Sequence, residues 1–247
     1  MRTTGNTILI TGGTSGIGLG LALRFLESGN SVIVAGRRKE LLDRIRADHP
    51  GIDTLVLDVT DPASVARARE TVTRTHPGLN VLVNNAGIML RENLLDEDWL
   101  RVAEDTVTTN LLGPIRMLHA FLPHLTARED AAVINVSSGL AFVPLPVTPT
   151  YNATKAAVHS FTESLRVQLA GTSVQVIELV PPAVRTTLMG QQDSEHAMPV
   201  DDFLTQTMSL LRTRPDATEI LVDNVKFLRH ATAEGTYDDV LATLSAY

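Results

Sequence analysis

Short apolar runs that alternate with helical patterns constrain the fold of this chain more than any other feature. The runs "TILIT", "SVIVAG" and "DTLVLDV" are nearly continuous in apolar residues and do not alternate with polar ones. Such runs are typical of strands that are buried on both faces of a sheet. Between them, apolar residues recur at helical spacing, as at Leu19, Leu23 and Leu26. Repeated strand–helix units of this kind predict an α/β class: a single-domain doubly wound Rossmann fold, with a parallel sheet of six or seven strands and helices on both faces.

The C-terminal part of the chain has a different pattern. The sixth strand is "SVQVIELVPP", after which "DDFLTQTMSLLR" and "ATEILVDNVKFLRH" are predicted as two amphipathic helices. A polar segment precedes them, and "TYDDVLATLSAY" gives an ambiguous tail. A chain of 247 residues is within the range of one α/β domain. We therefore expect a single domain over residues 1–247, with a substrate lid at about 186–203 and an atypical helical tail at about 215–247.

Composition excludes several classes of function. The chain has no cysteine, hence no disulfide, thiolate nucleophile or Cys metal site, which is in keeping with the cytoplasmic location that we expect. The net charge of −7 argues against a nucleic-acid partner, which would require a basic face. No apolar run reaches the ~18 residues of a membrane span, and the start "MRTTGNTILITGG" lacks the features of a signal peptide. His119 and His124 have no zinc-site spacing, so no metal is expected.

A glycine-rich segment, "ITGGTSGIGLG", joins the first strand to the first helix. Gly12, Gly16 and Gly18 permit a tight turn and a close approach of the backbone to a pyrophosphate at the helix N-terminus. The second strand ends in "VAGRR", with Arg37 and Arg38 near the position where an NAD-binding fold carries an acidic residue. Guanidinium groups there suit a 2′-phosphate, although two solvated arginines would look the same in sequence. The expected cofactor is NADP(H), in preference to NAD(H).

The segment "TYNATKAAV" places Tyr151 and Lys155 four residues apart at the start of a predicted helix, on one helix face. A tyrosine becomes a useful acid or base near neutral pH if a nearby ammonium in a poorly solvated cleft stabilises its phenolate. Ser138 stands 13 residues before Tyr151, at the carboxyl end of the fifth strand, where its hydroxyl would orient a reacting carbonyl. Alone, the Tyr–Lys spacing would also fit two surface side chains one helical turn apart, and the serine a turn or helix cap.

Taken in order, "TGGTSGIG", "NNAG", Ser138 and "YNATK" resemble the motifs of the short-chain dehydrogenases/reductases, over about Thr7 to Thr186. The resemblance implies Tyr151 as general acid/base, with Lys155 lowering its pKa and binding the ribose. It implies Ser138 as the group that orients the carbonyl, and Asn110 as a member of a proton relay. The cofactor-binding residues that it implies are Gly12, Thr14, Ser15, Gly16, Ile17, Gly18, Arg37, Arg38, Asp58, Val59, Asn85, Ala86, Gly87, Tyr151, Lys155, Pro181, Val184 and Thr186.

The chain departs from the family pattern in two places. Pro181–Pro182 replaces the usual Pro-Gly, and "PPAVRTT" resembles a branch loosely labelled with D-alanine transfer to teichoic acids. The usual seventh strand is not visible, which favours a homodimer through the helices at about 111–127 and 151–170, with a tetramer as the alternative.

A hydrophobic substrate pocket is predicted at the carboxyl end of the sheet. Its walls would be the loop 142–149 together with Met89, Leu90, Leu188 and Met189, unless these residues only pack within loops. The sequence therefore predicts an NADPH-dependent oxidoreductase that acts on a carbonyl or secondary alcohol. The alternatives are a non-catalytic NADP(H)-binding regulatory protein, which would not need Ser138, Tyr151 and Lys155, and a related lyase or epimerase.

Overall fold

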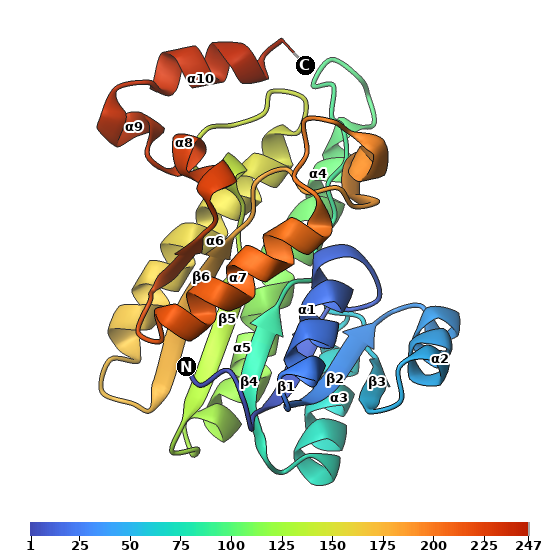
Figure 1. Cartoon of the computed structure of the whole chain (residues 1–247). Helices are drawn as coiled ribbons and strands as arrows, with labels where there is room; N and C mark the ends of the chain where they lie inside the picture. Colours follow the sequence, from blue (N-terminus) through green and yellow to red (C-terminus); the bar gives the residue numbers. More distant parts are fainter. Residues whose placement is uncertain (247) are drawn as a thin grey trace.

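The computed structural model describes residues 1–246, which form one parallel sheet with helices on both sides (Figure 1). Within these residues the sheet has seven strands in the order β3-β2-β1-β4-β5-β6-β7. The chain moves outward in one direction from β1 to β3 and then in the other from β4 to β7. The carboxyl ends of β1 and β4 therefore flank the point where the order reverses, which is where such folds bind their ligands. The strands are β1 (Thr7–Thr11), β2 (Ser31–Gly36), β3 (Ile52–Val56), β4 (Leu79–Asn84), β5 (Ala131–Val136), β6 (Val174–Val180) and β7 (Glu219–Leu221).

Two apolar cores cover the two faces of the sheet. Alternate residues of β1 divide between them: Ile8 and Ile10 join the core under α1, α2 and α7, and Leu9 joins the core under α3, α5 and α6. This division confirms that the continuous apolar runs are strands buried on both faces. The helices are α1 (Gly16–Glu27), α2 (Lys39–Asp48), α3 (Pro62–Thr75), α4 (Trp99–Val107), α5 (Gly113–Leu125), α6 (Pro149–Gln168), α7 (Val200–Thr213), α8 (Lys226–Arg229), α9 (Ala231–Glu234) and α10 (Tyr237–Leu244).

The expectation of two C-terminal amphipathic helices is right for α7 and wrong for the segment that follows. Glu219–Leu221 forms β7, a seventh strand that pairs in parallel with β6 through Leu179 and Ile220. Only Lys226–Arg229 of that segment is an α-helix. A three-residue strand is too short to show a period of two in the sequence, so tertiary pairing with β6 decides its conformation.

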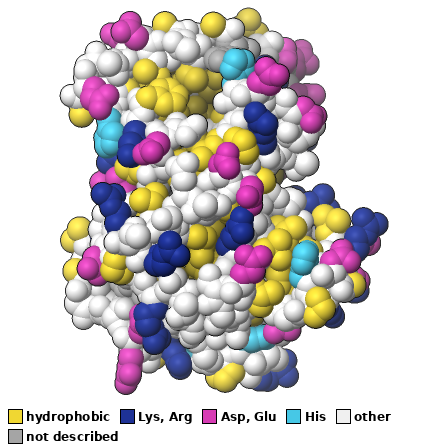
Figure 2. All heavy atoms as spheres, viewed as in Figure 1, with side chains coloured by type: hydrophobic (Ala, Val, Ile, Leu, Met, Phe, Trp, Pro, Cys, Tyr) yellow, Lys and Arg dark blue, Asp and Glu magenta, His cyan; other side chains and the backbone are white. Residues whose placement is uncertain are grey.

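The C-terminal helices α8, α9 and α10 fold back over the carboxyl end of the sheet (Figure 1). Helix α8 packs closely against the segment after β5, since a Cβ on Gly139 would lie 2.5 Å from Cδ1 of Leu228. Figure 2 shows apolar side chains gathered in a hollow below α10. Among the described residues, none of the helices has the length and apolar character needed to cross a membrane.

Candidate active site

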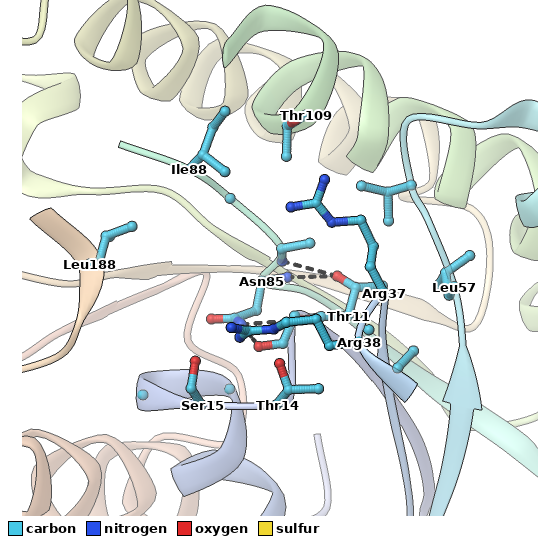
Figure 3. Close-up of a pocket in the computed structure, with 18 of the residues that line it drawn as sticks. Thr11, Thr14, Ser15, Arg37, Arg38, Leu57, Asn85, Ile88, Thr109 and Leu188 are labelled. Carbon is cyan, nitrogen blue, oxygen red and sulfur yellow. Dashed lines mark hydrogen bonds between the residues drawn. The ribbon is translucent and has the colours of Figure 1, made fainter. Parts of the chain in front are cut away.

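The glycine loop after β1 is fixed by contacts with the end of β4. A Cβ on Gly18 would lie 2.4 Å from the Gly12 carbonyl oxygen and 2.5 Å from Nδ2 of Asn85. Gly12 itself has φ of +64°, a conformation that side-chain-bearing residues rarely adopt. The amide of Asn85 donates to the carbonyl oxygens of Thr11 and Gly12, both at 3.1 Å (Figure 3). The "NNAG" segment therefore acts as a clamp that holds the loop in its turn.

The N-terminus of α1 opens directly onto this loop. Ser15 occupies the N-cap position without a side-chain hydrogen bond to the helix, and the first turn of α1 carries no acidic residue. The helix therefore presents free backbone N–H groups and the positive end of its dipole to an anion.

A cleft of about 380 Å³ extends from the glycine loop past the ends of β2 and β4. Its lining includes fourteen of the residues predicted to bind cofactor, namely Gly12, Thr14, Ser15, Gly16, Ile17, Gly18, Arg37, Arg38, Asp58, Val59, Asn85, Ala86, Gly87 and Thr186. Thr11, Leu57, Thr60, Ile88 and Thr109 also line it and were missed by the sequence analysis. The only sequence signal for them is that each lies next to a predicted residue.

Arg37 and Arg38 reach this cleft from the end of β2, as Figure 3 shows. Burial alone would raise the pKa of Asp58, but hydrogen bonds from Thr60 and the charge of Arg37 hold it below its usual value. Within the described part of the chain, the Arg38 guanidinium has no hydrogen bond or ion pair. The cleft thus has the free Arg38 guanidinium to bind an anion, and the charge of Arg37 is near enough to Asp58 to lower its pKa.

A second pocket of about 480 Å³ holds the predicted catalytic groups. Ser138, Tyr151 and Lys155 line it, as do Pro181 and Val184. The two cavities share a boundary, because five residues line both: Ile17, Asn85, Gly87, Thr186 and Leu188. A ligand that extends from the first cavity into the second would bring its far end to Ser138, Tyr151 and Lys155, the predicted catalytic groups.

Tyr151 and Lys155 lie one turn apart near the start of α6, and both are buried. The Lys155 ammonium lies 5.5 Å from the centre of the Tyr151 ring and donates a 2.8 Å hydrogen bond to the Val136 carbonyl. Burial raises the pKa of Tyr151 to about 12, and an interaction with the Ser138 hydroxyl opposes this rise. Burial lowers the pKa of Lys155 to about 8, against the charge of Glu178. The expected lowering of the tyrosine pKa by Lys155 is therefore not a feature of this structure.

Ser138 and Asn110 support the same pocket from neighbouring elements. Ser138 follows β5, and its hydroxyl accepts a hydrogen bond from the Leu140 amide. Asn110 lies in a π-helical turn, Thr108–Leu112, between α4 and α5, a type of turn found often at functional sites. Its side chain accepts from the Ile88 amide and donates to the Ile88 carbonyl, both at 2.8 Å. Asn110 thus fixes the segment after "NNAG", and it does not itself line the second pocket.

The walls of the second pocket differ in part from the predicted set. Met89, Leu188 and Met189 line it, as do Leu145 and Val147 of the predicted loop. Leu90 does not line the pocket and is 44% exposed. The predicted lid contributes residues from Thr186 to Met198. Four further lining residues come from the C-terminal segment and were not predicted from the sequence: Asn224, Phe227, Leu228 and Leu244.

Comparison with known proteins agrees with this geometry. The family described as short chain dehydrogenase matches residues 6–197. The uncharacterized oxidoreductase DltE of Bacillus subtilis is 47% identical over 189 residues, which cover 76% of this chain and 75% of that protein. The NADP-dependent 3-hydroxy acid dehydrogenase YdfG of Salmonella typhi is 36% identical, over 73% of each chain. A short chain dehydrogenase from Burkholderia cenocepacia, solved in complex with NADP, superposes with a TM-score of 0.83 at 27% identity, covering 99% of both chains.

The chain belongs to the short-chain dehydrogenase/reductase family, as the ordered motifs predicted. The similarity to DltE also confirms the branch that the "PPAVRTT" form indicated.

Proposed function

We propose that this family member is an NADPH-dependent oxidoreductase that transfers hydride between the nicotinamide cofactor and a carbonyl or secondary alcohol. The observation that carries the proposal is the placement of Ser138, Tyr151 and Lys155 in an apolar pocket that adjoins an anion-binding cleft. A regulatory protein that only bound the cofactor would need the cleft but not these three groups.

The residues of the first cleft fit NADP(H). The uncapped N-terminus of α1 and the glycine loop would hold the pyrophosphate, and the Arg38 guanidinium, with Arg37 beside it, would hold the 2′-phosphate. Lys155 would bind the ribose hydroxyls. When bound, the cofactor supplies or accepts the hydride, and the protein provides position and proton transfer.

Proton transfer is assigned to Tyr151, with Ser138 orienting the carbonyl oxygen against the phenol. Because burial raises the pKa of Tyr151 to about 12, the phenol keeps its proton at neutral pH. It is therefore ready to donate that proton to the oxygen of a carbonyl as reduction proceeds. Oxidation of an alcohol needs the phenolate as base, so at neutral pH the protonated phenol is the form that the reductive reaction requires.

The substrate is proposed to be a hydrophobic small molecule. Leu140, Leu145, Met189 and Phe227 contribute apolar surface to the pocket around the three catalytic groups. An apolar cavity with few polar groups is the usual form of a site that binds such a molecule.

A homodimer through α5 and α6 is also proposed. Leu112, just before α5, is 38% exposed, and Val167 of α6 is 77% exposed, so this side of the molecule presents apolar side chains to solvent. Light scattering coupled to size-exclusion chromatography tests this, with Val167→Glu expected to shift the protein toward the monomer. The cytoplasmic location stays a prediction.

The activity is tested by mixing the protein with NADPH and a panel of ketones, aldehydes and quinones, and following the absorbance of NADPH. Turnover is expected for the parent, and loss of turnover for Tyr151→Phe. Tyr237→Phe, the same change at a tyrosine outside the pocket, is the matched control and should keep activity. No turnover by the parent, or full turnover by Tyr151→Phe, would contradict the assignment. Equal rates with NADH and NADPH would contradict the cofactor preference.

A further inference from the structure

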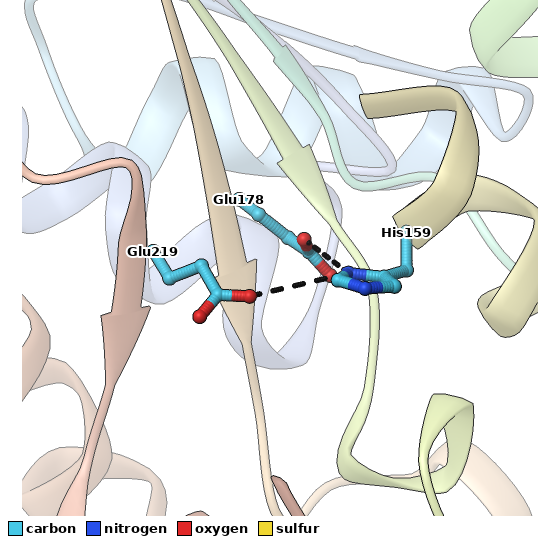
Figure 4. A group of neighbouring side chains, drawn as sticks. All are labelled: His159, Glu178 and Glu219. Carbon is cyan, nitrogen blue, oxygen red and sulfur yellow. Dashed lines mark hydrogen bonds and ion pairs between the residues drawn. The ribbon is translucent and has the colours of Figure 1, made fainter. Parts of the chain in front are cut away.

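A group of charged side chains lies between α6, β6 and β7, outside the pocket already described. Glu178 of β6 is fully buried, and its Oε2 lies 2.8 Å from Nδ1 of His159 in α6. The Glu219 carboxylate of β7 lies 4.0 Å from the same nitrogen (Figure 4). Within the part of the chain that the structure describes, Oε1 of Glu178 has no hydrogen-bond partner. A buried carboxylate with an unpaired oxygen is costly and calls for a compensating positive charge.

His159, Glu178 and Glu219 have the donor atoms of a metal site, lying within 4.8 Å of one another. However, Arg229 of α8 already supplies a cation here, since its Nε lies 3.1 and 3.2 Å from the two oxygens of Glu219. The same guanidinium lies 4.6 Å from the centre of the Phe142 ring. The Arg229 guanidinium therefore already occupies the Glu219 carboxylate, where a divalent cation would bind. Glu178 is paired with His159 and has no lysine or arginine within ion-pair distance among the described residues.

Lys155 is a buried cation on the helix that also carries His159, the partner of Glu178. It precedes His159 by one turn of α6, so both project from the same helix face. Its ammonium donates to the carbonyl of Val136 in β5, and Val136 pairs with Leu179, the residue next to Glu178 on β6. The other charged or titratable groups around Lys155 and Glu178 are Tyr151, His159 and Glu163 on α6, Glu219 on β7 and Arg229 on α8.

We propose that Glu178 is a positioning residue that keeps Lys155 in its ammonium form, so that the lysine retains its charge although it is buried from solvent. The value of this role to the enzyme rests on the proposed function, in which Lys155 binds the ribose hydroxyls of the cofactor. The direction of the pKa shifts agrees with the geometry: burial lowers the pKa of Lys155 to about 8, and the charge of Glu178 raises it. Without that carboxylate, the lysine would lose its proton at lower pH.

The test uses the small number of lysines in the chain, which are Lys39, Lys155 and Lys226. Protein labelled with ¹³C at the lysine Cε gives three signals, which Lys39→Arg and Lys226→Arg assign by difference. A pH titration of the parent and of Glu178→Gln then reports the pKa of Lys155 without any need for activity. The expected result is a downward shift of about one pH unit in Glu178→Gln, the lower end of the effect of a close opposite charge.

Glu163→Gln is the matched control, because it removes the same charge from the exposed partner of the same histidine, whose Nε2 lies 3.8 Å away. It should leave the Lys155 titration unchanged. If Glu178→Gln does not fold, Glu178→Met fills the same space without a polar group and should give the same shift. An unchanged Lys155 titration in the folded Glu178 variant, or an equal shift in Glu163→Gln, would overturn the proposal.

An activity measurement separates this inference from the proposed function. In Glu178→Gln the alkaline limb of kcat/KM should move to lower pH by the same amount as the lysine titration, while Glu178→Asp, which keeps the charge, should restore the limb toward the parent's. If Glu178 had only a structural role, the pH profile would not depend on whether the side chain at this position is charged. If the parent has no oxidoreductase activity, the proposed function fails, whereas the lysine titration still decides the role of Glu178.

Discussion

Replacing Lys155 by methionine is expected to stabilise the fold at neutral pH while removing the activity. The lysine is 5% exposed, and the structure holds its ammonium in a region that burial makes unfavourable for charge. Methionine has a similar length and no charge, so it should fill the same space without the desolvation cost.

The size of the effect follows from the pKa of Lys155, which burial lowers from 10.5 to about 8. At about 1.4 kcal/mol per pH unit, keeping the ammonium in the fold costs about 3 kcal/mol. The substitution also leaves the Val136 carbonyl without its 2.8 Å donor, a loss of about 1 kcal/mol. The net expectation is that the variant is more stable than the parent by about 2 kcal/mol at pH 7.

The stability difference between Lys155→Met and the parent should depend on pH. A lysine with a lowered pKa in the fold carries its full cost below pH 8, and the cost is relieved as pH rises toward 10.5. The advantage of Lys155→Met over the parent should therefore shrink above pH 8 and disappear near pH 10. Urea unfolding of both proteins at pH 7 and pH 10 measures it. A variant that is less stable than the parent at pH 7, or a difference that does not change with pH, would refute the reasoning.

Three further outcomes are expected. Gly18→Ala should lose NADPH affinity, measured by fluorescence titration, and about 1–3 kcal/mol of stability from overpacking, because its Cβ would lie 2.4 Å from the Gly12 carbonyl oxygen. Gly171→Ala, whose Cβ would meet nothing within 4 Å, should change neither. Ser138→Ala should reduce kcat for carbonyl reduction about 100-fold by removing a donor to the substrate oxygen, and the exposed Ser160→Ala should not. Alcohol oxidation with NADP⁺ should rise about tenfold per pH unit up to about pH 8, since the base is the phenolate of Tyr151, whose pKa is about 12. The rate should level off above pH 8, where Lys155 loses its proton; a rate that does not change with pH below 8 would contradict the assignment of Tyr151 as base.

The sheet and the cofactor cleft were predictable because each of their features is local in sequence. A strand buried on both faces leaves a continuous apolar run, and a glycine loop between strand and helix leaves its own spacing. Parallel strands then bring their carboxyl ends to one edge, so the placement of Arg37, Asn85 and Ser138 around one site follows from the order of the elements. The sequence predicts the sheet and the cleft correctly because the local residue pattern and the tertiary fold favour the same strands and loops.

The C-terminal wall of the pocket was not predictable for the opposite reason. β7 is only Glu219–Leu221, and its pairing with β6 is a contact between residues distant in sequence. The return of α8 to Gly139, which brings Phe227 and Leu228 to the pocket, depends on where that strand ends. No periodicity in "ATEILVDNVKFLRH" records this, because the segment contains a short strand, a 3₁₀ turn and a one-turn helix in succession.

The pKa values of Tyr151 and Lys155 show a second limit of sequence reasoning. The spacing of four residues correctly places the ammonium beside the ring, at 5.5 Å from its centre. Spacing does not report solvation, however, and the burial of both groups dominates their pKa values. A buried ammonium that has partly lost its preference for the proton is a weak source of stabilisation for a phenolate. An enzyme that relies on this pair therefore needs a further negative charge to hold the ammonium, and the fully buried Glu178 of β6 is in the place to provide it.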